Sequence, residues 1–90
     1  MSKPSETTLA EAVHQAEQYV TAGAIYHHYT DKALRYKVLA LGIQESTHTV
    51  CIIYQALYGE KLVWTRDLDD WLSYVVTPAG RLPRFAKESE

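Results

Sequence analysis

The pattern of apolar and polar positions is clearest in the middle of the chain, where β-branched and aromatic residues form their densest run. Residues 50–58 are nearly all apolar, a Gly-Glu-Lys segment at 59–61 interrupts them, and a second β-rich segment occupies 62–66. Two such runs separated by a glycine-containing break predict a β-hairpin. A strand pair this apolar must be covered on at least one face, and we expect the rest of the chain to supply that cover.

Ahead of the hairpin, the pattern predicts one helix. Thr8 and Glu11 fit a capping box, apolar residues then recur at spacings of three and four, and Gly23 stands where a helix commonly ends. A stripe this small does not stabilise an isolated helix, so we expect it to pack against the β domain or against a second copy of itself. The stripe consists of Leu9, Ala12, Val13, Ala16, Tyr19 and Val20.

The other segments read as short strands and turns. Residues 25–30 and 36–43 are rich in β-formers, with a polar loop predicted at 31–35 and a connection into the hairpin at 44–48. After the hairpin, the sequence predicts a helical turn at 67–71, a last full strand at 72–77 and an edge segment at 82–85.

Together these elements predict a mainly β fold. We expect a small antiparallel SH3-like β-barrel with an N-terminal α-helix, and an open α+β sheet is the alternative. The predicted division is a tail and helix at 1–22, a β domain at 23–86 and a C-terminal tail at 87–90.

Composition narrows the class of protein. Ninety residues, a hydrophobic fraction of 47% and a net charge of -2 indicate one globular domain rather than a disordered chain. No apolar stretch reaches the ~20 residues of a membrane span, no signal peptide is evident, and Cys51 has no partner for an internal disulfide, so we predict a cytoplasmic protein without membrane contact. The acidic balance argues against nucleic-acid binding by charge alone, although Lys32, Arg35 and Lys37 form a local basic cluster.

Short motifs from Gly23 to Phe85 share their order and spacing with a bacterial family. They are Gly23, Tyr26 and His28-Tyr29; Ile52-Ile53-Tyr54 and Leu57-Tyr58-Gly59; Trp64, Arg66 and Leu68; and Pro83-Arg84-Phe85. With these motifs the chain resembles domain-of-unknown-function family 1653, an uncharacterised small β domain. The resemblance implies a compact β domain and brings no established activity.

The chain departs from that family at three places. The segment 44–47 keeps only Thr47 of the family's His-Ser-Glu-Thr run, Asp67 replaces a proline after Arg66, and Trp71 replaces a phenylalanine. The altered segment weakens any role that depends on the family's histidine or glutamate there.

Metal and hydrolytic chemistry are not favoured by the spacing of the candidate residues. His27 and His28 point to opposite faces of a strand, and His48 and Cys51 diverge if extended, so we predict no metal site. Ser46 can be combined with Glu45 and a histidine by residue type, but the chain has no glycine-flanked serine and no phosphate-binding glycine loop. We therefore predict no catalytic residues and no cofactor, and an enzyme, such as a small hydrolase, is the less favoured reading.

Ligand recognition by aromatic groups and an arginine is the favoured function. Trp64 and Arg66 share one face of a predicted strand; that face is either core or groove, and core packing is the simpler reading for Trp64 and Tyr54. Arg66 needs an anion, either a ligand or a salt bridge to Glu45, Asp67 or Asp69. The predicted ligand-binding residues are Tyr26, His28, Tyr29, Tyr58, Trp64 and Arg66, with Glu45 and Thr47 at the groove edge.

The prediction is thus a binding or adaptor module for an unknown small molecule or protein. Two alternatives stay open beside it: a nucleic-acid-binding module, and an assembly protein that dimerises through its helix. A monomer and a homodimer are both compatible with the sequence.

Overall fold

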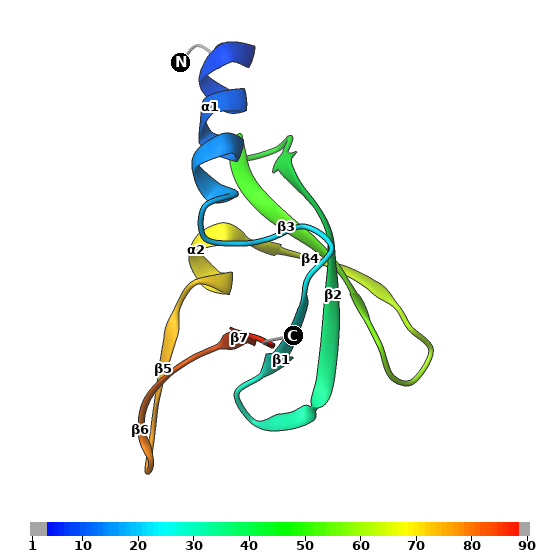
Figure 1. Cartoon of the computed structure of the whole chain (residues 1–90). Helices are drawn as coiled ribbons and strands as arrows, with labels where there is room; N and C mark the ends of the chain where they lie inside the picture. Colours follow the sequence, from blue (N-terminus) through cyan, green and yellow to red (C-terminus); the bar gives the residue numbers. More distant parts are fainter. Residues whose placement is uncertain (1–3, 89–90) are drawn as a thin grey trace.

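The protein is built around one five-stranded antiparallel sheet, with both helices on the same side of it (Figure 1). The computed structural model describes residues 4–88. The strand order is β4-β3-β2-β1-β7, and β5 and β6 form a separate two-stranded sheet. The elements are α1 Glu6–Ala16, β1 Ile25–His28, β2 Asp31–Gln44, β3 Thr49–Ala56, β4 Val63–Asp67, α2 Leu68–Trp71, β5 Tyr74–Thr77, β6 Gly80–Pro83 and β7 Phe85–Lys87.

The predicted central hairpin is confirmed as β3 and β4. Their register is continuous from Cys51 opposite Asp67 to Gln55 opposite Val63. β3 is the most buried strand of the sheet, and Cys51 within it is a buried free thiol. The strand is buried because β2 and β4 flank it and because both helices, α1 and α2, contact it.

The sheet curls strongly but does not close by backbone pairing among the described residues. β4 and β7 are its two edges, so the mainly β fold with one long N-terminal helix is confirmed, whereas the closed SH3-like barrel is not. Bulges between Val38 and Ala40 in β2 and between His27 and His28 in β1 bend these strands. The curl encloses a core of Val20, Tyr26, Tyr36, Val38, Ile52, Tyr54, Ala56, Trp71 and Phe85.

Helix α1 begins and ends earlier than the sequence predicted. Ser5, not Thr8, is the N-cap, and its side chain accepts a hydrogen bond from the amide of Thr8. The helix ends at Ala16, and turns carry the chain to Gly23, whose φ of 87° starts the approach to β1. Tyr19 therefore lies outside the helix and is 67% exposed, while Val20 is fully buried.

Three further predictions along the chain are corrected. The polar segment 31–35 is not a loop but the first part of β2, where Arg35 lies opposite His27 of β1. The predicted strand 72–77 is shorter and stays outside the main sheet, since β5 pairs only with β6 and the hairpin extends away from the sheet (Figure 1). The edge segment predicted at 82–85 divides into the end of β6 and the start of β7, with the latter at the sheet edge.

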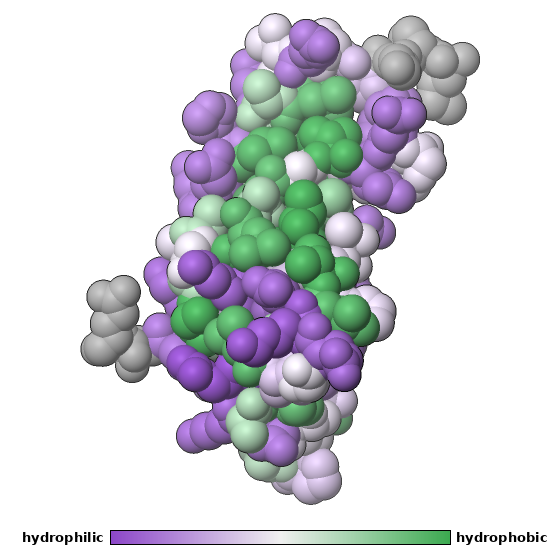
Figure 2. Space-filling model, turned by 90° about the vertical axis from the view of Figure 1, so that its right-hand side faces the viewer, coloured by the Kyte–Doolittle hydropathy of each residue, from purple (hydrophilic) through white to green (hydrophobic). Residues whose placement is uncertain are grey.

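The remaining surface of the sheet is partly apolar. Figure 2 views the molecule from the side of β2 and the β3–β4 hairpin, and apolar residues gather there in a patch bordered by polar ones. Within residues 4–88, neither helix approaches the length and apolar character that a bilayer crossing requires.

Candidate functional site

The candidate site lies on the concave face of the sheet, and β3 and β4 supply its first residues. Tyr54 of β3 lies opposite Trp64 of β4, and Ile52 lies opposite Arg66. Directly opposed residues share a face, so Trp64 and Arg66 point to the same side as the buried Tyr54. Trp64 is nevertheless 51% exposed, because it is not part of the hydrophobic core. The simpler reading of Trp64 as core is therefore wrong, whereas that of Tyr54 is confirmed.

The curl of the sheet brings β7 across to these residues. Phe85 of β7 is stacked on Trp71 of α2, with 3.9 Å between ring centroids and 4° between planes. Tyr54 meets the same two rings at 6.0 and 4.9 Å. The guanidinium carbon of Arg66 lies 5.2 Å from the centroid of the Phe85 ring. Side chains from the two edge strands β4 and β7 thus meet across the concave face, with an arginine over an aromatic ring.

Two arginines share one carboxylate at this edge. Arg66 Nη1 donates to Asp70 Oδ2 at 2.7 Å, and Arg84 Nε lies 3.9 Å from Asp70 Oδ1. Arg84 Nε also donates to Ser73 Oγ at 2.9 Å. The predicted salt bridge of Arg66 exists, but its partner is Asp70, the residue four positions on, rather than Glu45, Asp67 or Asp69.

His28 is next to these arginines and stays neutral at pH 7. Partial burial lowers the pKa of His28, and the positive charges of Arg66 and Arg84 lower it further. Its Nδ1 is hydrogen-bonded to the hydroxyl of Thr30, with 2.7 Å between the two atoms. The ring centroid lies 4.6 Å from Tyr29 and 5.3 Å from Phe85.

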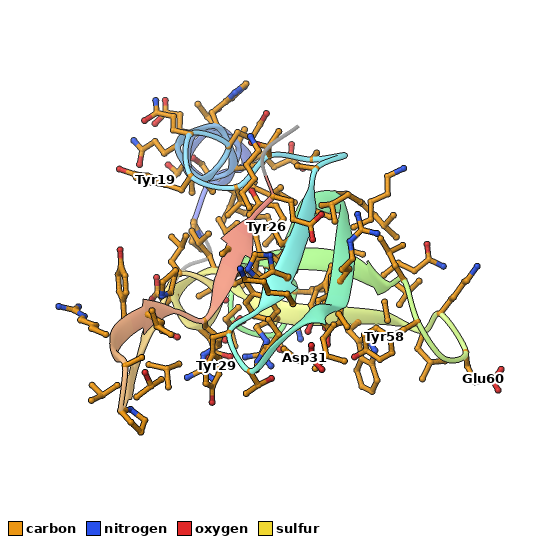
Figure 3. All side chains as sticks on the ribbon, turned by 60° about the horizontal axis from the view of Figure 1, so that its bottom comes forward. Tyr19, Tyr26, Tyr29, Asp31, Tyr58 and Glu60 are labelled. Carbon is orange, nitrogen blue, oxygen red and sulfur yellow. The ribbon has the colours of Figure 1, made fainter. Side chains whose placement is uncertain are left out.

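Tyr58 forms the other side of the site. Its hydroxyl is hydrogen-bonded to that of Tyr36, and burial together with this bond raises the pKa of Tyr36. Tyr58 is 41% exposed, and with Trp64 it lines a shallow hollow of about 110 Å³ at the base of the β3–β4 loop. Tyr58 lies on the sheet side of this loop and Glu60 at its tip, with Tyr29 across the same end of the molecule (Figure 3).

We call this surface the aromatic–arginine face. It comprises six side chains, of which the sequence predicted five: His28, Tyr29, Tyr58, Trp64 and Arg66, with Arg84 added by the structure. Arg84, Phe85 and Asp70 were not predicted as site residues. For the first two, the available signal was the Pro-Arg-Phe motif.

Three predicted site residues lie elsewhere. Tyr26 is a core residue, 4% exposed, whose hydroxyl accepts a hydrogen bond from the amide of Thr21. Glu45 and Thr47 belong to the β2–β3 turn, at the opposite end of these strands from the β1–β2 turn and the β3–β4 loop. The structure therefore does not bring Glu45 or Thr47 to the edge of the aromatic–arginine face.

The other candidate chemistries are not assembled in the described part of the chain. Across residues 4–88, no three His, Cys, Asp or Glu side chains gather in a metal-binding group. In the basic cluster, Arg35 is bound by Glu88 through both carboxylate oxygens, and this contact raises the pKa of Arg35 and lowers that of Glu88.

The fold and the site define a small antiparallel β domain with an aromatic concave face. Comparison with known proteins agrees: residues 24–87 match the model of the family described as protein of unknown function DUF1653, and the chain belongs to this family. It is similar to a crystal structure of a DUF1653 protein from Bordetella bronchiseptica, with 33% identity and a TM-score of 0.70 over 81% of this chain and 92% of the other. No curated protein matches the chain.

Proposed function

We propose that the protein is a binding module whose aromatic–arginine face holds an anionic ligand that also carries a planar group. The observation that carries this proposal is the sharing of one carboxylate by two guanidinium groups. Arg66 and Arg84 both approach Asp70, and His28 beside them is neutral at pH 7. Arg66, Arg84 and Asp70 together therefore carry one uncompensated positive charge, which lies beside exposed aromatic rings.

The two arginines also retain hydrogen-bond donors. A guanidinium has five N–H groups, and the side-chain bonds to Asp70 and Ser73 use one from Arg66 and one from Arg84. Both side chains are about 30% exposed, so their remaining donors are accessible to a carboxylate or phosphate.

Trp64 and Tyr58 account for the planar group. Half-exposed aromatic rings on the same face as charged donors favour stacking on a base, a ring or a peptide plane. In the described part of the chain, Trp64 has no aromatic ring packed against it. About half of its surface is exposed and is available to a ligand.

The first test is an amide NMR titration of the labelled chain with separate pools of nucleotides, short oligonucleotides and acidic peptides. We expect shifts around residues 28–29, 58–66 and 84. Trp64→Ala should weaken the binding found by about fivefold or more, since stacking contributes roughly 1–3 kcal/mol. Val63→Ala is the matched control, because Val63 is as exposed as Trp64 but faces the other side of β4.

The arginine contribution has its own pair of variants. Arg84→Gln should weaken binding and reduce its dependence on salt, whereas Arg81→Gln should not, since Arg81 stacks over Tyr74 in the separate hairpin. The proposal is wrong if no pool produces shifts at the face, or if the control variants weaken binding as much as Trp64→Ala and Arg84→Gln do.

A further inference from the structure

Strand β4 is an open edge of the main sheet. On its inner side β4 pairs with β3, and four of the five residues of β4 are exposed. The amide of Ala56 donates to the carbonyl of Leu62, so the alternation of an antiparallel ladder directs the backbone groups of Trp64 and Arg66 toward β3. The backbone groups of Val63 and Thr65 then point outward, and within residues 4–88 no other backbone group pairs with them.

Two of the features that commonly prevent an edge strand from pairing, proline and a bulge, are absent from β4. Val63–Asp67 contains neither proline nor glycine, and its register against β3 has no bulge. Val63 and Trp64 are each more than half exposed, and their side chains lie on opposite faces of the strand. The opposite edge, β7, is only three residues long and follows Pro83 closely, so it offers far less to a partner strand.

We infer that the β4 edge is the surface through which two copies of this chain pair, with their β4 strands antiparallel. The opposite charges at the two ends of β4 favour a second copy in the antiparallel orientation. Lys61 lies before β4, and Asp67 and Asp69 lie at its end, all three exposed. Antiparallel pairing sets Lys61 of one copy against the acidic end of the other, whereas parallel pairing sets the acidic ends against each other.

The outward backbone groups also define the register. A twofold axis at Thr65 pairs it with the partner's Thr65 as a hydrogen-bonded pair, and places Trp64 opposite the partner's Arg66. Paired threonines are favourable cross-strand neighbours, and an arginine beside an exposed tryptophan adds a cation–π contact. Because opposed residues share a face, both aromatic–arginine faces then open on the same side of one continuous ten-stranded sheet.

Sedimentation equilibrium over a range of protein concentrations tests the inference. The wild-type chain should form a dimer, and Thr65→Pro should raise the dimer dissociation constant by at least about tenfold, because two symmetry-related hydrogen bonds are lost. The monomer fold should survive, since the amide of Thr65 makes no bond to β3. Thr65→Val, which keeps the amide and the β-branch, should dimerise like wild type.

Cross-linking keeps the test decisive if the proline variant does not fold. Facing residues of a hydrogen-bonded pair have Cα atoms about 5.5 Å apart, which suits a disulfide. Thr65→Cys should therefore cross-link under mild oxidation, while Thr77→Cys in the β5–β6 hairpin and the wild-type chain with its buried Cys51 should not. A wild-type chain that stays monomeric, or a dimer that Thr65→Cys fails to cross-link, overturns the inference.

Discussion

His28 is the residue whose surroundings most clearly change its chemistry. Partial burial and two neighbouring arginines lower its pKa, so the folded protein resists the protonation that the unfolded chain undergoes near pH 6.5. The unfolded state therefore binds more protons as the pH falls below that value. Protons then favour unfolding, and the contribution of His28 to stability is complete above pH 6.5 and lost toward lower pH.

The corresponding prediction concerns the pH dependence of unfolding. We expect the urea midpoint of the wild-type protein to fall between pH 7 and pH 5, and His28→Asn to reduce this fall because the titrating group is gone. A His28→Asn protein with the full wild-type slope would show that His28 is not the group responsible.

At the scale of elements, the short helix α2 has an effect on packing out of proportion to its four residues. It carries Trp71, which is 2% exposed and touches Phe85, Tyr54 and Tyr26 from three different strands. Asp67 precedes the helix in an extended conformation without a side-chain capping bond, so packing of Trp71 rather than capping holds α2 in place.

The two tryptophans should accordingly differ in their effect on stability. Trp71→Ala should lower the free energy of unfolding by roughly 3–5 kcal/mol, since it removes a large buried ring and leaves a cavity. Trp64→Ala should change it by no more than about 0.5 kcal/mol, because that ring is half exposed. Urea unfolding measures both, and similar losses for the two variants would contradict the division between core and site.

The elements that the sequence predicted well are those whose pattern is local. The β3–β4 hairpin is evident because its apolar runs and its break are contiguous. The start of β2 was read as a loop because its residues are polar, yet Arg35 is ordered there by Glu88, which is 53 positions away in the sequence. Distant partners of this kind leave no periodicity in the chain.

The candidate site divides in the same way. Residue type and strand alternation were enough to select Trp64, Arg66 and Tyr58. Arg84 and Phe85 reach the site only because the sheet curls until side chains from its two ends meet, and the bulges that help bend it have no clear signature in the sequence. The prediction for Glu45 was wrong because the sequence does not show which end of β2 lies near the site. Glu45 follows the C-terminal end of this strand, whereas the site is at its N-terminal end.

At the scale of the whole molecule, the β5–β6 hairpin is set apart from the main sheet. Its strands pair only with each other, and the bond from the amide of Arg84 to the carbonyl of Ser73 closes its base. Val76 and Tyr74 are largely exposed. A hairpin with so little burial opens more readily than strands that share a core.

Hydrogen exchange should reveal this difference. We expect the amides of β5 and β6 to exchange at least about 100-fold faster than those of Ile52 and Tyr54, which corresponds to an opening free energy roughly 3 kcal/mol lower. Exchange measured by NMR in the native state gives both sets in one experiment. Equal protection of hairpin and core would mean that the molecule opens as a single cooperative unit.

The unlike positions of the two tryptophans have an optical consequence. The indole of Trp71 is shielded by Phe85 and Tyr54, whereas that of Trp64 is in contact with water. A soluble quencher such as iodide can reach the second and not the first. The intrinsic fluorescence of the unlabelled chain therefore contains two separable signals, one that follows the integrity of the core and one that follows occupation of the concave face.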